Sequence, residues 1–341
     1  MQQTLSRKCG GWLRKETRLR PLLAVLATLC LFGNCPAQVP AFYKSVTSVT
    51  WIVEDIDKVR PAWVALGLKD IQEYPNMAEI AIYEGKPITI YVWQITGHLG
   101  SLNVDMIQPA EGQLNAYTHF LEKHGDGIFS IVHEVPTQAA LEHEITRMRS
   151  KGVGVLQRVT IPKQGTTFVY FDTELEGKFN LGLVLRAETK KPMTGPQMIS
   201  HFGFDVRDLP SVSLYWEKLG FPPLRIEHAS SRADSRYREQ PLSLDFSVGY
   251  EKYDQFTYEW IAAPSKPANI YADYLKTPHH EGIQHIGLPM TDLKQSITEY
   301  ERLGYHVVQS GAWGDVGKPS SGEYAYIDTS GGVSVELLQS Y

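Results

Sequence analysis

Residues 282–308 read GIQHIGLPMTDLKQSITEYERLGYHVV, and after a polar loop residues 323–339 read EYAYIDTSGGVSVELLQ. Apolar alternation, a helical stretch that ends in Leu-Gly and further alternating runs predict strand, helix, strand, loop and two strands. His285 lies inside the first predicted strand and Glu336 inside the last. A histidine and a carboxylate are costly to bury among apolar neighbours unless something pairs with them. A metal ion is one such partner.

The same pattern occurs four times along the chain: a short alternating run, an amphipathic helical stretch and a Leu-Gly or Lys-Gly helix stop. The four copies begin with SVTWIVED (residue 48), SIVHEVPT (residue 130), HFGFDVRD (residue 201) and HIGLPMTD (residue 285). Their closing segments end at NVDMIQP, FNLGLVL, TYEWIAAP and VELLQ. Because the copies share little identity, their spacing carries the argument for a repeat. The sequence therefore predicts an α+β protein of four βαβββ modules.

The four modules pair into two homologous halves. Equivalent positions in the first and last strands of the modules lie 153 to 156 residues apart between the two halves. In this alignment the position of His285 corresponds to His201, Ser130 and Ser48, and that of Glu336 to Glu259, Asn180 and Asp105. The polar, Pro-containing segment AETKKPMTGPQ (residues 187–197) links the halves. We expect one domain over residues 41–190 and a second over residues 195–341.

Four polar residues of the second half form the candidate site. Alternate residues of a strand share a face, so an early His and a late Glu of one module can point to the same side of its sheet. Two modules side by side would bring together His201, Glu259, His285 and Glu336. Two imidazoles and two carboxylates suit a divalent metal such as Zn, Mn, Fe, Co or Ni, with positions left for water or substrate. The first half has no imidazole at the equivalent positions and is predicted to carry no comparable site.

Residues 1–37 are predicted to be a signal peptide. Six Lys/Arg residues precede the apolar run LLAVLATLCLFG (residues 22–33), and the following Cys-Pro-Ala predicts cleavage after Ala37. The run is shorter than the roughly 20 residues that span a bilayer, so a retained anchor is the alternative. All three cysteines fall in this segment, which leaves the mature chain without a disulfide or thiolate site. Lipidation of Cys35 is a further alternative, although Asn34 stands where lipidation signals have a small residue.

Removal of this segment makes the chain more acidic. The formal net charge changes from -5 to -10, with 27 basic against 37 acidic residues remaining. Such a balance argues against nucleic acid as a partner, because phosphate binding needs a basic surface. No later apolar run is long enough to span a membrane. We therefore expect a periplasmic or secreted protein that acts on a small molecule.

The arginine-rich segment SSRADSRYREQ (residues 230–240) has two interpretations. It contains Arg232, Arg236 and Arg238 next to Glu239. A solvated loop between strands is the simpler interpretation, and a clamp for a substrate anion is the other.

The quoted motifs resemble a known family. Four βαβββ modules, with HIGLPMTDL (residues 285–293) opening the last and VELLQ (residues 335–339) closing it, are similar to the vicinal oxygen chelate superfamily of glyoxalases, methylmalonyl-CoA epimerases and extradiol dioxygenases. The segment from residue 258 to residue 290 most resembles the epimerase and glyoxalase branch. The resemblance implies two tandem glyoxalase-like domains, each a sheet curled into a half-open cup. It also implies that His201, Glu259, His285 and Glu336 are the metal ligands.

The resemblance further implies a metal-dependent isomerase, epimerase or lyase. Its substrate would be a small α-hydroxycarbonyl or keto-acid-type compound, and the metal would stabilise the enediolate formed when a carbon-bound proton leaves. Glu336 is the first candidate for the catalytic base and Glu239 the second. For a protein outside the cytoplasm, a sugar, a keto sugar or an aromatic breakdown product is easier to supply than a coenzyme A or glutathione adduct.

Two other functions remain open. An extradiol-type dioxygenase would use His201, His285 and Glu336, but Glu259 as a fourth ligand would crowd the face where oxygen binds. A non-catalytic module that binds a small molecule is the second alternative, although such relatives lack the full ligand set.

Overall fold

The computed structural model describes residues 39–187, 199–253, 256–278, 281–315 and 318–341. The predicted signal peptide, with Cys35, and nearly all of the linker lie outside the described residues, so these remain predictions. The described chain after Ala37 forms one compact unit, and the division at residues 190–195 also remains a prediction. Within the described ranges, no helix is both long and apolar enough to cross a membrane.

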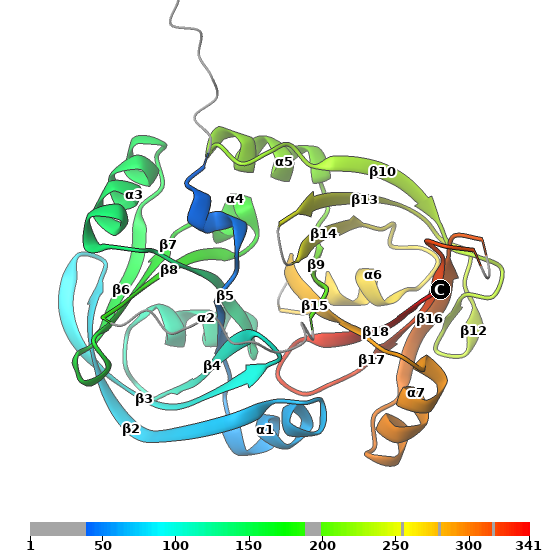
Figure 1. Cartoon of the computed structure of the whole chain (residues 1–341), viewed down its shortest axis with the longest axis horizontal. Helices are drawn as coiled ribbons and strands as arrows, with labels where there is room; N and C mark the ends of the chain where they lie inside the picture. The colour runs from blue at the N-terminus through cyan, green and yellow to red at the C-terminus, as the bar shows by residue number, and fades with distance from the viewer. Residues whose placement is uncertain (1–38, 188–198, 254–255, 279–280, 316–317) are drawn as a thin grey trace, which may run out of the picture. The chain divides into compact units, whose positions relative to one another are not determined.

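The predicted α+β class and the four βαβββ modules are confirmed (Figure 1). The first module follows a 3-10 turn η1 (Ala41–Lys44) and consists of β1 (Ser48–Ile52), α1 (Ile56–Ala65), β2 (Lys69–Tyr83), β3 (Lys86–Leu99) and β4 (Leu102–Pro109). The second consists of α2 (Ala116–His124), β5 (Gly127–Glu134), α3 (Gln138–Ser150), β6 (Val155–Ile161), η2 (Pro162–Gln164), β7 (Thr166–Phe171), α4 (Glu174–Gly177) and β8 (Asn180–Arg186).

The other two modules build the second half. The third consists of β9 (His201–Asp205), α5 (Leu209–Lys218), β10 (Arg225–Ser230), β11 (Arg236–Tyr237), β12 (Gln240–Pro241), β13 (Asp245–Lys252) and β14 (Thr257–Ala262). The fourth consists of α6 (Ile270–Tyr274), β15 (Gly282–Pro289), α7 (Leu293–Arg302), β16 (Val307–Trp313), β17 (Gly322–Ile327) and β18 (Ser334–Ser340).

The long helix of each module has the same start and stop signals. Its N-cap side chain accepts a hydrogen bond from a backbone N–H three residues later, and the four caps are Asp55, Thr137, Asp208 and Asp292. A glycine in the left-handed region follows each helix, at Gly67, Gly152, Gly220 and Gly304. These local signals are why the repeat is visible in the sequence.

The two halves curl their sheets to different extents. In the first half the strand order is β1-β4-β3-β2-β6-β7-β8-β5, and pairing of β2 with β6 closes this sheet into a barrel. In the second half the order is β10-β13-β14-β9-β15-β18-β17-β16-β11-β12. Strands β10 and β16 occupy the places of β2 and β6, but they are not neighbours, and the short β11–β12 hairpin pairs with β16 instead. The expected half-open cup is therefore present in the second half, whereas the first half is a closed barrel.

A pair of tryptophans of the first half binds a loop of the second. Trp51 Nε1 donates a 2.7 Å hydrogen bond to the carbonyl of Gly331, and Trp63 Nε1 donates one of 3.0 Å to the carbonyl of Ser330. The two indoles pack edge to face, with ring centroids 4.3 Å apart. The bound loop leads directly into β18, the strand that carries Glu336.

Candidate metal centre

The two histidines face each other across the central strand pair of the open sheet. Strands β9 and β15 are antiparallel, and their register sets His285 opposite Gly203 and His201 opposite Gly287. A Cβ atom at Gly203 would lie 1.8 Å from His285 Cε1, and one at Gly287 would lie 2.2 Å from His201 Cε1. Each imidazole therefore occupies space that only a glycine on the neighbouring strand leaves free. The rings meet edge to face, with the two Nε2 atoms 3.1 Å apart.

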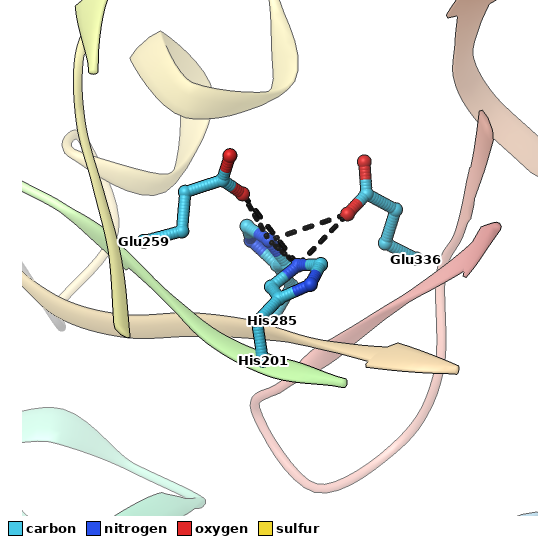
Figure 2. A group of neighbouring side chains, drawn as sticks. All are labelled: His201, Glu259, His285 and Glu336. Atoms are coloured by element: carbon cyan, nitrogen blue, oxygen red, sulfur yellow. Dashed lines mark hydrogen bonds and ion pairs between the residues drawn. The ribbon is translucent and has the colours of Figure 1, made fainter. Parts of the chain in front are cut away.

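The two glutamates approach the histidines from the flanking strands, as Figure 2 shows. Glu259 on β14 pairs with Gly203, and Glu336 on β18 pairs with Gly287, so the two modules contribute in the same way. Oε2 of Glu336 lies 2.9 Å from Nε2 of His201 and 3.7 Å from Nε2 of His285. The corresponding distances for Glu259 are 3.5 and 3.6 Å. One ligand atom from each of the four residues lies within 4.8 Å of the other three.

Hydrogen bonds behind the imidazoles direct their Nε2 atoms to this centre. The Nδ1 atom of His285 lies 2.7 Å from Oε1 of Gln284, which can only accept. The Nδ1 atom of His201 lies 3.0 Å from the hydroxyl of Ser200, which donates its own hydrogen to the carbonyl of Gly287. Both histidines can therefore carry their hydrogen on Nδ1 and present a lone pair on Nε2, the arrangement of metal-binding histidines.

The electrostatics of the centre favour a cation. Burial alone would lower the pKa of His201, but its hydrogen bond with Glu336 and the charge of Glu259 raise this pKa above the ordinary value. Burial alone would raise the pKa of Glu259, but the neighbouring imidazoles of His285 and His201 lower it. Positive charge is thus stabilised between the two carboxylates, and a divalent ion supplies it. The donor set, the tautomers and the charge all fit a divalent metal.

A cavity of about 450 Å³ opens over the centre. Its polar lining includes His201, Glu259, Glu336, Ser230, Ser231 and Arg232. Aromatic and aliphatic side chains form the remaining wall: Phe246, Val248, Tyr250, Ile261, Tyr271, Trp313, Tyr324, Tyr326 and Leu338. Tyr250 is hydrogen-bonded to Glu259, and burial together with the charge of that glutamate raises the pKa of Tyr250. The phenol therefore stays protonated and donates to the carboxylate.

Glu239, the second candidate for the base, lies away from this cavity. It is exposed at the turn between β11 and β12, where its φ is 66°. Its side chain borders a different depression, together with Arg236 and His306. The structure thus brings four of the predicted site residues together but not Glu239, because the β11–β12 hairpin pairs with the outer strand β16.

In the first half, the alignment of Glu336 with Asn180 is wrong by two residues. Glu336 pairs with Gly287, and the equivalent pair in the barrel is Gly182 with Val132. The structural counterpart of Glu336 is therefore Gly182. The other three correspondences agree with the strand pairing, since β1, β4 and β5 set Ser48, Asp105 and Ser130 at the places of His201, Glu259 and His285.

The sequence prediction did not include several residues that shape the site. The glycines that make room for the imidazoles recur as His-x-Gly in residues 201–203 and 285–287, and the first half has Thr50 and Val132 in their place. This His-x-Gly spacing is the signal in the sequence that marks the two glycines. Ser200 and Gln284 carry no recognisable signal, because their role depends on where the ring nitrogens point.

The chain is similar to known proteins in sequence and in fold. Residues 48–171 match the Glyoxalase/Bleomycin resistance protein/Dioxygenase superfamily. A search of curated protein sequences finds no match. Among solved structures, a mutant of 4-hydroxymandelate synthase from Streptomyces coelicolor has a TM-score of 0.59 at 12% identity, covering 87% of this chain and 92% of that one.

Two further structures are more distant. A halotolerant catechol dioxygenase has a TM-score of 0.45 at 14% identity, covering 87% of this chain and 86% of that one. A catechol 2,3-dioxygenase has a TM-score of 0.44 at 12% identity, with 86% and 93% covered. At such identities the likeness concerns the fold alone.

The four βαβββ modules in two curled sheets agree with the sequence match of residues 48–171. In sequence over this stretch, and in fold over both halves, the chain is similar to the vicinal oxygen chelate superfamily. The second half provides a set of side chains that fits a divalent metal ion.

Proposed function

We propose that the protein is a metal-dependent isomerase, epimerase or lyase that moves a proton on a small substrate with two neighbouring oxygens. The observation that carries this proposal is the fourth donor. Oε2 of Glu259 lies at nearly equal distances, 3.5 and 3.6 Å, from the Nε2 atoms of both histidines. A set of two histidines and two glutamates balances the charge of a dication and leaves less room for oxygen beside an organic substrate.

The chain's own side chains would have separate roles. His201, His285, Glu259 and Glu336 would hold a divalent ion, which when bound supplies Lewis-acid stabilisation of negative charge on substrate oxygens. His285 and His201, and to a smaller extent Tyr250, lower the pKa of Glu259 and so favour its carboxylate form. Glu336 has one oxygen 2.9 Å from His201, and Figure 2 shows its other oxygen pointing away from the imidazoles. We assign the proton transfer to Glu336. A base must reach the substrate carbon, and the free oxygen of Glu336 can do so while His201, His285 and Glu259 continue to hold the ion.

Proton exchange tests the reaction class. Metal-loaded protein in heavy water is expected to incorporate deuterium at the exchangeable carbon of one or more members of a panel of α-hydroxycarbonyls and keto acids, without consuming oxygen. Glu336→Gln removes a ligand as well as the base, so it is compared with the wild type at saturating metal, where it is expected to abolish the exchange. The matched control is Asp105→Asn, at the position in the first half that is equivalent to Glu259. This variant is expected to change neither the deuterium exchange nor the metal content. Oxygen uptake with catechols would instead identify a dioxygenase.

A dioxygenase is the second candidate, and one geometric feature favours it. Glu336 lies within 2.9 Å of His201, whereas Glu259 stays at 3.5 Å or more from both imidazoles and is the most exposed of the four side chains, at 19%. His201, His285 and Glu336 thus form a tighter group of two histidines and one carboxylate, the ligand set of non-haem iron oxygenases. In that case Glu259→Gln would retain activity, whereas in the proposed proton transfer it would weaken metal binding and activity together.

We also propose that the protein acts outside the cytoplasm, on the strength of the basic start and apolar run of residues 1–37. Mass spectrometry of the mature protein is expected to find its N-terminus at Gln38. A full-length chain in the cytoplasmic fraction would contradict this localisation.

A further inference from the structure

The opening of the second-half sheet is occupied by a segment that the first half lacks. In the barrel, β2 and β6 pair directly. In the open sheet, residues 231–244 lie in the chain between β10 and β13, and their β11 strand pairs with the edge of β16. We refer to residues 231–244 as the mouth segment.

Hydrogen bonds within the mouth segment fix its shape. The hydroxyl of Ser231 accepts from the backbone N–H of Leu244 at 2.7 Å, and the backbone N–H of Ser231 donates to the carbonyl of Leu244, also at 2.7 Å. The N–H of Leu242 donates to the carbonyl of Ser235 at 2.9 Å. Ser235 is fully buried, and Ser231 and Arg232 of the segment line the cavity. The segment is thus a built part of the cavity.

Arg232 is the charged residue that this segment brings to the cavity. Among the described residues that line the cavity, it is the only Lys or Arg. Its Nη1 donates to the carbonyl of Gly314, in the connection between β16 and β17 on the other side of the opening. Its buried Nε has no hydrogen-bond acceptor among the described residues. The nearest carboxylate is that of Asp234, at 3.7 Å from Nε and 55% exposed, too distant for a hydrogen bond.

Arg232 has an ion-pair partner, Asp234, only outside the cavity lining, so no lining residue balances its charge once a metal is bound. Glu259 and Glu336 together carry two negative charges, which a divalent ion at the centre neutralises. The guanidinium is then a surplus positive charge in a wall that is otherwise largely aromatic and aliphatic. An arginine with free donors recognises a carboxylate through paired hydrogen bonds.

We propose that Arg232 forms a subsite for a carboxylate of the substrate, separate from the two oxygens that reach the metal centre. The inference rests on the proposed function and narrows its substrate class to small organic acids. The body of such an acid would lie between Phe246 and Val248 on one side and Trp313 and Tyr324 on the other, all of which line the cavity. A planar or aromatic body suits these walls because rings stack on rings and on the guanidinium.

Binding of simple probes tests the subsite without any turnover. Calorimetry on the full mature chain compares benzoate with benzamide, which has nearly the same shape but no charge. Benzoate is expected to bind at least about 10-fold more tightly, because a hydrogen bond to a charged group adds roughly a factor of 10 to 100. Arg232→Gln is expected to remove this difference and to leave benzamide binding unchanged. Arg238→Gln is the matched control, because Arg238 is six residues away, exposed and paired with Asp273.

Direct binding of the probe to a metal must be distinguished from binding to Arg232. The same titrations are therefore made on protein stripped with a chelator and on the His201→Ala variant. The expected result is a benzoate preference that becomes weaker but persists in both, because Glu259 and Glu336 then lack their counter-ion, together with its complete loss in Arg232→Gln. A preference that disappears with the metal but survives in Arg232→Gln would overturn the subsite.

Other outcomes also decide the question. An equal loss of the benzoate preference in Arg238→Gln would show that benzoate is attracted by the positive surface in general, and it would likewise overturn the proposal. Phenylphosphonate that binds more tightly than benzoate would assign the subsite to phosphate-type anions and reject the carboxylate. If benzoate binds as expected but no substrate of the panel exchanges deuterium, the subsite stands while the proposed reaction fails. With a substrate in hand, Arg232→Gln is expected to raise KM about 10-fold or more with little change in kcat.

Discussion

The imidazole of His285 lies directly over Gly203, at a place where a Cβ atom on that glycine would come within 1.8 Å of the ring. His201 and Gly287 repeat the same relationship on the other strand. The centre therefore depends on two residues that hold no metal. A methyl group at either glycine must displace a ligand, because the other atoms nearby belong to paired strands.

Gly203→Ala is expected to lower the affinity for a divalent metal at least about 10-fold, since it moves one of four ligands. Overpacking is also expected to reduce the free energy of unfolding by about 1 to 3 kcal/mol. Metal content after dialysis and thermal unfolding of the metal-free chain measure the two effects. Gly154→Ala is the control, because a Cβ there meets nothing within 4 Å. Full metal content in Gly203→Ala would show that the imidazole can move and still coordinate.

The hydrogen bond from His285 to Gln284 gives a second prediction. Gln284→Leu removes the acceptor for the Nδ1 hydrogen, 2.7 Å away, so the ring loses the group that fixes its tautomer. The affinity for zinc is expected to fall about 10- to 100-fold, as for other partners of metal-binding histidines. Competition with a chelating dye measures this. Gln295→Leu, on the exposed surface of α7, is expected to bind zinc like the wild type. An unchanged affinity in Gln284→Leu would mean that the carboxylates alone hold the ring in place.

Trp51 links the barrel to the loop before β18. Trp51→Phe keeps an aromatic ring but removes the hydrogen bond to the carbonyl of Gly331, leaving a buried acceptor without its donor. The free energy of unfolding is expected to fall by about 1 to 3 kcal/mol. Denaturant titration of the metal-free protein measures the change.

Trp93 provides the matched control for this substitution. Its buried Nε1 has no hydrogen-bond partner among the described residues, so Trp93→Phe loses no bond. Equal destabilisation by Trp51→Phe and Trp93→Phe would assign the effect to ring size and not to the hydrogen bond.

Glu79 inside the barrel makes stability depend on pH. Burial, with the charge of Asp105, raises the pKa of Glu79 to about 8 from its ordinary 4.5. The folded chain therefore keeps a proton that the unfolded chain releases, and stability falls as the pH rises from about 4.5 through about 8. Glu79→Gln has no proton to release, so its advantage over the wild type is expected to grow across this window to several kcal/mol, at most about 5.

Chemical denaturation at pH 5, 7 and 9 measures this advantage. Glu122→Gln, on the exposed face of α2, is the control and is expected to follow the wild type at each pH. A constant difference between Glu79→Gln and the wild type would mean that Glu79 does not titrate in this range.

The sequence predicted the modules and the four-residue cluster because both depend on local signals. Helix caps, helix-stop glycines and strand alternation recur at fixed spacing, so His201 and His285 fall at matching places. The assignment of Asn180 as the counterpart of Glu336 was wrong because the sequence of one strand does not determine its register against the neighbouring strand. That register comes from pairing with β5, a contact between residues about 50 positions apart.

Closure of the first barrel and the position of Glu239 were hidden for the same kind of reason. Whether β2 meets β6 depends on the free energy of pairing two distant strands, and no short motif marks it. Glu239, the second candidate for the base, belongs to the arginine-rich segment of residues 230–240. The pairing of β11 with β16 directs it to the surface, while Arg232, seven residues earlier, reaches the cavity.

The open sheet of the second half has a consequence for association between chains. A closed barrel has no free edge, but in the described part of the open sheet β10 and β12 each pair on one side only. Such edges can take up a strand from another molecule. Here β10 exposes Arg225, Glu227 and His228, and β12 ends in Pro241, which has no N–H to donate. Charge and proline make both edges poor templates for aggregation, so substitutions there would alter solubility while leaving the metal centre intact.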